Sequence, residues 1–537
     1  MRLALPTLLM VLLAAGAVCA APPDVSKFSD QRVQRSIERA QQWLWSQQQA
    51  DGSWEGYSAS WGEWPGGPTS LVLFALLESG QNAQEPQMAR ALDWLSIQPS
   101  SKTYTLGLRC NVWALANRQT GGKYTEMLNQ DVRQLVRSTK DGSYGYDAFG
   151  AGQSSGDNSN SQYGVLGVWA GALANVEIPT EYWRQVETHW STAQQPDGGW
   201  GYKRDEKNTS ATMTAAGIAS LYVCMDNLHM ERFIRCDTGI RPKPIDEGVE
   251  WLSERFEKTL EGKLLGHGDL FYHLFGVERV GFASGRKYFG TADWYKMGAV
   301  RLLEKQRKDG SWKGKWDPLV STSYALLFLA RGQKPVLVNK LRFDGDWNNR
   351  PRDLAVLCRW MSEKFESNVY WQIINLEVPV SEWHDAPILY LSGSRAPDFS
   401  KADVDKLRDY VLQGGVLFSA AECNGRQFMG ALRRVYRSMF PDYPVEACGA
   451  DHDLYSTYFP LRGRPRFHVI SNGVRPLAIH CDEDLPLAWQ VRRFATQRWA
   501  FEGAANVAMY VTDKGIFRHR GVSHWPDAPG EFDPRRT

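Results

Sequence analysis

The sequence of 537 residues has no excess of charge of one sign, because 62 Lys and Arg face 60 Asp and Glu, and no segment is dense in basic residues. Binding of nucleic acid depends on clustered positive charge, so nucleic acid is not expected as a partner. After the N-terminus, no stretch reaches the roughly 18 consecutive apolar residues of a membrane span. The sequence therefore predicts no span in the mature chain.

Cysteine is also scarce, with eight residues in the chain. Without Cys19, which lies in the N-terminal segment, the others are an odd number spread widely, and this is no disulfide framework. Cys224 and Cys236 are close enough to bridge in an oxidising compartment, although buried free thiols are the favoured interpretation. C-x-x-C pairs and an H-E-x-x-H motif are missing, so neither a metal site nor a cofactor is predicted.

Aromatic residues, by contrast, are abundant, with 22 Trp, 21 Tyr and 22 Phe. Such an excess serves a large stacked core, an apolar or sugar-binding cavity, or both. Composition does not choose among these.

The N-terminus has the pattern of a secretory signal peptide. Arg2 precedes a largely apolar segment from Leu3 to Val18, and Ala20 provides a small residue at the expected cleavage point. The alternative, a lipoprotein signal at Cys19, places Val18 where a small residue is required. We therefore expect residues 1–20 to be removed and the protein to be exported, periplasmic or secreted. The Pro-containing tail, residues 523–537, is predicted to be disordered.

One short element recurs through the first 330 residues. Its four copies are Asp51-Gly52-Ser53-Trp54, Asp141-Gly142-Ser143-Tyr144, Asp197-Gly198-Gly199-Trp200 and Asp309-Gly310-Ser311-Trp312. Segments 90–95 and 248–252 repeat the helix that precedes the turn and complete six units. Each unit is predicted to form a helix, a turn and a second, more apolar helix. Six such hairpins predict a closed α/α toroid over residues 28–332, with the apolar helices in an inner ring.

The repeat also carries a family resemblance. Arg39-Ala40-x2-Trp43-Leu44-x3-Gln48-x3-Gly52-x-Trp54 resembles the QW repeat of squalene-hopene cyclases and related prenyltransferase-like proteins, and residues 194–200 and 306–312 resemble its second half. The resemblance implies an (α/α)6 barrel. It does not extend to the chemistry, because the D-x-D-D acid of class II cyclases, the D-x-C zinc ligands of prenyltransferases and the G-C-G-E-Q string of thioester domains are all missing.

The segments that join first to second helices are expected to lie together at one mouth of the toroid. Their aromatic and acidic residues suit an amphipathic lipid such as an isoprenoid, or a saccharide. The candidate ligand-binding residues are Trp61, Trp64, Tyr146, Asp157, Tyr202, Asp205, His267, Asp269, Trp316 and Asp317. The alternative is that Asp157, Asp205 and Asp317 cap inner helices. His267 and His273 flank Asp269, but no third metal ligand is evident.

After residue 332 the pattern changes to alternating strands and helices. Strands are expected at 336–343, 387–391 and 416–420, and helices at 353–364, from Ser400 to Gly414, and at 427–439. This order predicts a multidomain chain whose second part is an α/β domain with a doubly wound, largely parallel sheet. Segments 388–394, 412–418 and 451–459 resemble the uncharacterised DUF4159 family, which is related to glutamine-amidotransferase-like flavodoxin folds. The resemblance covers residues 335–520.

Cys423 follows a buried strand and precedes a helix, where amidotransferases place their nucleophile. His480 and Asp482 supply a possible base and its orienting acid. The alternative is a binding crevice at the strand ends, open to a protein partner. The turn around Cys423 lacks the first glycine of a nucleophile elbow, the strand-to-helix turn that presents the nucleophile in such enzymes. We therefore expect the Cys423 sulfur to lie farther than about 4 Å from His480.

Two hypotheses follow for function. In the first, which we prefer because the catalytic motifs tied to this fold are missing, the chain is a binding or scaffold protein of the cell envelope. Its toroid holds an amphipathic, isoprenoid or saccharide ligand. In the second, it is an enzyme that acts on such a ligand in the barrel, or on an amide at Cys423.

Overall fold

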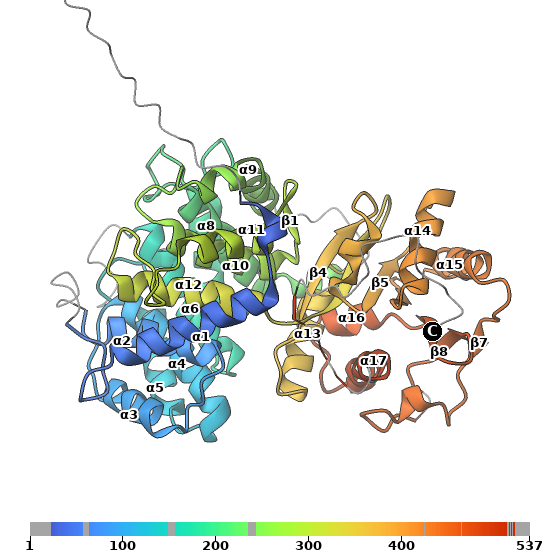
Figure 1. Cartoon of the computed structure of the whole chain (residues 1–537), viewed down its shortest axis with the longest axis horizontal. Coiled ribbons are helices and arrows are strands. Elements are labelled where there is room, and N and C mark those ends of the chain that lie inside the picture. Colours follow the sequence, from blue (N-terminus) through green and yellow to red (C-terminus); the bar gives the residue numbers. More distant parts are fainter. Residues whose placement is uncertain are drawn as a thin grey trace, which may run out of the picture.

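The computed structural model describes residues 23–56, 64–148, 156–234, 243–423, 425–462 and 464–512, with residues 515, 517, 519 and 520. The expected signal peptide, Trp61, Cys236 and the C-terminal tail lie outside these ranges. The chain forms two parts, a helical one drawn in blue to yellow and an α/β one drawn in yellow to red (Figure 1).

The first part consists of helices that alternate between an outer and an inner ring. The outer helices are α1 (Asp30–Ser46), α3 (Pro86–Ser96), α5 (Thr125–Ser138), α7 (Thr180–Ala193), α9 (Lys243–Leu260) and α11 (Trp294–Lys305). The inner helices are α2 (Gly67–Glu78), α4 (Thr103–Thr120), α6 (Asn158–Leu173), α8 (Ala211–Leu228), α10 (Leu270–Ser284) and α12 (Pro318–Gly332). Two short strands, β1 (Tyr288–Phe289) and β2 (Ala292–Asp293), precede α11.

The inner helices form a closed ring, because each packs on the next and α12 packs on α2. They are buried on nearly every side, whereas outer helices bury one stripe and expose their charged face. The predicted toroid of six helix hairpins is confirmed, and segments 90–95 and 248–252 lie in outer helices α3 and α9.

The repeated Gln residues tie three of the hairpins to their neighbours, and the repeated Trp residues bind back to the preceding outer helix. The Trp312 indole donates to the Leu302 carbonyl at 2.9 Å, near the end of the preceding outer helix. The Gln306 amide donates to Gly310 and to Ser36 of α1, each at 2.9 Å, and so joins the last hairpin to the first. Gly310 has φ +96°, and a Cβ there would lie 2.5 Å from the Arg39 carbonyl oxygen, so this turn requires glycine.

The second part has a seven-stranded sheet of order β4-β3-β5-β6-β9-β8-β7. The strands are β3 (Val336–Arg342), β4 (Tyr370–Asn375), β5 (Ile388–Gly393), β6 (Val416–Ala421), β7 (Glu446–Ala447), β8 (Phe467–Ser471) and β9 (Pro476–Cys481). The pairs from β4 to β9 are parallel, and β8 pairs antiparallel with both of its neighbours. The predicted doubly wound, largely parallel sheet is confirmed.

Helices cover both faces of the sheet. On one face a core forms with α13 (Asp353–Lys364), α16 (Leu485–Gln490) and α17 (Arg498–Val511). On the other, a second core forms with α14 (Lys401–Leu412) and α15 (Arg426–Met439). The predicted Ser400–Asp403 capping box is present at the start of α14.

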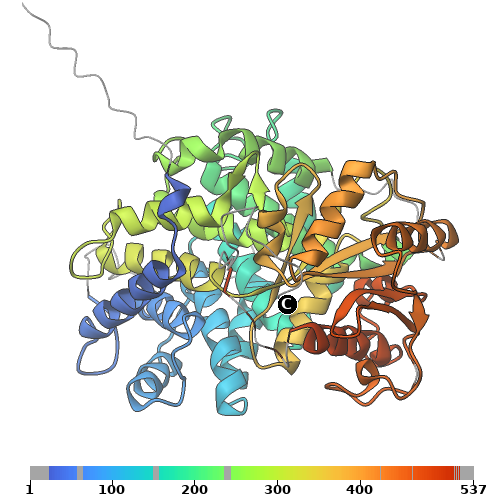
Figure 2. The same cartoon turned by 45° about the vertical axis from the view of Figure 1, so that its right-hand side comes forward.

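The toroid contacts the open edge of this sheet. The backbone N–H of Ile373 in β4 donates to the Gly285 carbonyl at 2.6 Å, just after α10. Arg352 and Asp226 form a buried ion pair across the same junction, 2.6 Å between Nε and Oδ1. The α/β part therefore lies beside the ends of α8 and α10, and comes forward in the rotated view (Figure 2). None of the helices in the described ranges is both long enough and apolar enough to cross a membrane.

Candidate functional site

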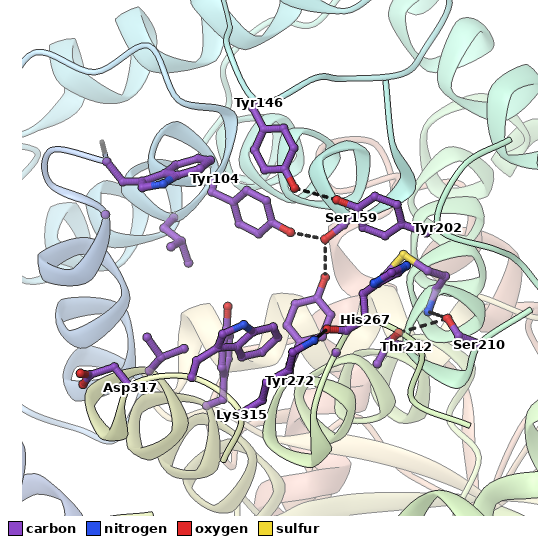
Figure 3. Close-up of a pocket in the computed structure, with 18 residues that line it drawn as sticks. Tyr104, Tyr146, Ser159, Tyr202, Ser210, Thr212, His267, Tyr272, Lys315 and Asp317 are labelled. Carbon is purple, nitrogen blue, oxygen red and sulfur yellow. Dashed lines mark hydrogen bonds between the residues drawn. The ribbon is translucent and has the colours of Figure 1, made fainter. Parts of the chain in front are cut away.

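A cavity of about 710 Å³ opens at the N-terminal ends of the inner helices. All six inner helices contribute to its wall, either through their first turns or through the loops that precede them. Its larger side chains are Trp64, Tyr104, Leu108, Tyr146, Tyr202, Met213, His267, Tyr272, Lys315, Trp316, Val320 and Tyr324 (Figure 3). The wall is thus mainly aromatic and apolar.

A line of hydroxyl groups crosses one side of this cavity. Ser159 of α6 hydrogen-bonds with the hydroxyls of Tyr104 and Tyr272, and Figure 3 shows the three groups meeting. Behind them, the Gln162 amide donates to Tyr272 and accepts from buried Arg279. Burial raises the pKa of Tyr272 to about 12, so its hydroxyl stays neutral at pH 7. These groups offer a ligand hydroxyl both donors and acceptors.

Aromatic rings form part of the rim. Trp64 packs edge-on against Tyr146, with centroids 5.5 Å apart. The Tyr146 hydroxyl hydrogen-bonds with that of Tyr202 at 2.7 Å, and Tyr202 packs against His267. Nearby, the Lys315 ammonium donates to the His267 carbonyl at 2.8 Å. Loops from five hairpins are therefore tied together around the opening.

The carboxylates near the opening are occupied as helix caps. Asp157 accepts from the Asn160 backbone N–H at 2.8 Å, at the start of α6. Asp269 accepts from the Tyr272 N–H at 3.0 Å and begins α10. Asp317 accepts from the Leu319 N–H at 2.8 Å and begins α12. Each stabilises a helix N-terminus, as the capping alternative predicted for Asp157 and Asp317.

The remaining predicted residues have different positions. Trp64, Tyr146, Tyr202, His267, Trp316 and Asp317 line the cavity. Asp205 is exposed in a loop, and Ser210 rather than Asp205 caps α8. The sequence argument missed Tyr104, Ser159, Tyr272 and Tyr324. They lie within the first two turns of inner helices, so their place near each helix start was the available signal.

The candidate catalytic site of the α/β domain, at Cys423, differs from a nucleophile elbow in the state of its sulfur. Cys423 follows β6 with φ +58° and is disulfide-bonded, so its sulfur provides no thiolate for attack. Its backbone N–H donates to Asp484 at 2.8 Å. The buried His480 ring hydrogen-bonds through Nδ1 with Ser419 at 2.7 Å, and burial lowers its pKa to about 4. Cys224 is a buried free thiol, as the favoured interpretation had it.

Two groupings in or beside the toroid could be considered for a metal. Asp293, Glu382 and Asp385 lie together at the junction of the two parts. However, the Lys287 ammonium lies among them, 2.5 Å from Glu382 and 2.7 Å from Asp385, and already supplies the cation. His267 and His273 do not converge, because His267 is exposed at the rim and His273 is buried against Thr259.

Three comparisons relate the chain to known proteins. No curated protein matches it at a significant level. The structure of the type II terpene cyclase MstE from Scytonema, without ligand, is 14% identical, with a TM-score of 0.40, over 57% of this chain and 99% of that one. A variant of that cyclase in complex with merosterolic acid A is 14% identical, with a TM-score of 0.38, over 56% and 97%.

The sequence of the second part matches a family profile. Residues 336–512 match the family described as Domain of unknown function (DUF4159). The match begins at the first residue of β3 and ends just after α17, so it spans the sheet and the helices on both of its faces. The α/β part of this chain is therefore a DUF4159 domain.

Proposed function

We propose that this protein is an exported binding protein that holds an amphipathic ligand, an isoprenoid or a saccharide, in the cavity of its toroid. The observation that carries the proposal is the cavity itself, about 710 Å³ in volume and lined mainly by aromatic and apolar side chains with one line of hydroxyls. Such a wall suits a ligand with an apolar face and a few hydroxyl groups.

The contacts of the acidic residues favour binding over catalysis. A general acid must deliver its proton to the substrate, but Asp157, Asp269 and Asp317 each direct a carboxylate oxygen at a backbone N–H of their own helix. The disulfide at Cys423 supports export, because disulfides persist in oxidising compartments such as the periplasm.

The test is ligand binding to the purified mature protein. Farnesol serves as an isoprenoid probe and cellotetraose as a saccharide probe, and binding is followed by tryptophan fluorescence, since Trp64 and Trp316 line the cavity. Lipids and glycans that co-purify are identified by mass spectrometry. We expect saturable binding of one probe class, and Trp316→Ala should weaken it about tenfold by removing an aromatic contact.

Trp94→Ala is the matched control, because Trp94 is also half-buried but lies on outer helix α3. It should leave the affinity unchanged. If neither probe binds, or if both variants weaken binding equally, the cavity is not the binding site.

A further inference from the structure

Two histidines face each other across the last antiparallel pair of the sheet. His468 of β8 and His480 of β9 are direct partners in the strand register, so their side chains lie on the same face. Asp482 comes two residues after His480, just beyond the end of β9. His468 Nδ1 and His480 Nε2 each lie 3.6 Å from a different oxygen of the Asp482 carboxylate. The strand pairing thus gathers two imidazoles and one carboxylate.

Among the residues that the structure describes, neither ring nitrogen that faces Asp482 has a hydrogen-bond partner. The distance of 3.6 Å exceeds that of an N–H···O hydrogen bond, and the His480 side chain is only 1% exposed. Buried polar atoms without partners are rare in folded proteins, so two at one place need a specific reason.

The far side of the His480 ring is held in a way typical of metal ligands. Its Nδ1 hydrogen-bonds with the Ser419 hydroxyl oxygen at 2.7 Å, and Ser419 also accepts from the Tyr436 hydroxyl at 2.7 Å. A metal-binding histidine usually donates its second ring N–H to a carboxylate, carbonyl or water oxygen, which orients the ring and leaves the other nitrogen free to bind, and the Ser419 oxygen takes this place for His480. Ser419 has two lone pairs and can accept from both groups.

We propose that His468, His480 and Asp482 form a binding site for a divalent transition-metal ion such as Zn²⁺. Imidazole nitrogen and carboxylate oxygen are ligands that such ions accept, and three protein ligands leave a position for water or another group. This site is separate from the cavity in the toroid and does not depend on the function proposed for it.

Arg433 is the competitor of the metal ion. Its guanidinium Nη2 lies 3.0 Å from Asp482, and its side chain is 36% exposed, so it can turn into solvent. The two imidazole centroids are 6.4 Å apart. Binding of one ion by both rings therefore requires half-buried His468 to turn toward Asp482. Removing the Arg433 charge should therefore strengthen binding of the ion. If Asp482 had only a structural role, removing that charge would not strengthen ion binding.

The experiment is a Zn²⁺ titration of the full mature protein after dialysis against EDTA, by calorimetry. We expect one ion per chain, at least tenfold weaker binding in His468→Gln and Asp482→Asn, and several-fold tighter binding in Arg433→Gln. His519→Gln is the matched control and should bind Zn²⁺ unchanged, because His519 also contacts a carboxylate, Asp30 at 3.2 Å, in the other part of the molecule. Circular dichroism checks that each variant is folded.

Replacement by Co²⁺ gives a second readout, since nitrogen ligands shift its visible absorption and the shift should be lost in His468→Gln. The proposal is overturned if the folded His468→Gln protein binds Zn²⁺ as tightly as the unchanged one. It is also overturned if Arg433→Gln weakens binding.

Discussion

Glu422 is a carboxyl group enclosed at the end of β6, with no exposed surface. Asn349 donates to one of its oxygens at 2.7 Å. Burial raises the pKa of Glu422 to about 7, and Lys340 opposes this shift only in part. The folded protein therefore holds this proton more tightly than the unfolded chain does.

A pH dependence of stability follows at this residue. The contribution of Glu422 is fully present below about pH 4.5, the ordinary pKa of the group, and is lost as the pH rises toward 7. The loss amounts to about 3 kcal/mol. The Gln side chain of Glu422→Gln has the shape of Glu but cannot ionise. The variant should therefore be more stable than the unchanged protein at pH 8 but not at pH 4. Chemical denaturation at both values measures this, with exposed Glu377→Gln as control. An advantage of the same size at both pH values would contradict the assignment.

At the scale of elements, the inner helices α6, α8, α10 and α12 are each capped by the side chain at their start. The α10 cap, Asp269, also accepts from the Lys315 backbone N–H at 3.2 Å, and so holds the loop that carries Trp316. Cap and cavity wall are therefore linked, because the bond that starts one helix also positions the next loop.

Replacement of Asp269 separates capping from a chemical role. Asp269→Ala should lower the free energy of unfolding by about 1–2 kcal/mol, whereas Asp269→Asn, which can also cap, should lower it by much less. Thermal denaturation and farnesol or cellotetraose titration are the measurements. If Asp269→Asn is as stable as the unchanged protein but loses binding of the probe, the carboxylate acts on the ligand rather than on the helix.

At the scale of the whole molecule, buried charges join the two parts. The Lys287 ammonium, from the toroid, lies between Glu382 and Asp385 of the α/β part and is 1% exposed. Burial acts to raise the pKa of Asp385, but this ammonium outweighs burial and holds that pKa well below its usual range. Removal of one member of a buried ion pair leaves its partner unpaired in a medium of low polarity.

Lys287→Met should therefore destabilise the protein by about 3–5 kcal/mol, because Glu382 and Asp385 lose their shared cation. Calorimetry should also show the unfolding of the two parts moving apart in temperature. Lys296→Met is the control, since Lys296 lies 3.5 Å from Glu382 and is partly exposed. Its loss should be about 1 kcal/mol or less. Equal losses in the two variants would show that Lys287 does not join the parts.

The repeats and their closure into a ring could be predicted from sequence because their determinants are local. The Asp-Gly turn, the helical spacing and the apolar second helix each lie within one hairpin, and six copies bury one another's open faces. The first strands and helices of the α/β domain could be predicted for the same reason, and so could the Ser400–Asp403 capping box.

The sites could be predicted only in part, because they depend on residues brought together from distant segments. Sequence placed Trp64, Tyr146 and Trp316 at the opening of the toroid, since loops at one end of a ring must meet. It did not show that Tyr104, Ser159 and Tyr272 align their hydroxyls, because that alignment depends on how neighbouring helices are turned.

By itself, then, the sequence determined the six hairpins, the alternating strands and helices that follow, and which aromatic loops face one mouth. Only the tertiary structure decided the state of each polar group. It made Asp157 and Asp269 caps, made Cys423 part of a disulfide, and set His468 opposite His480. The physical reason is that periodicity follows from neighbours along the chain, whereas charge, hydrogen bonding and ligation follow from neighbours in space.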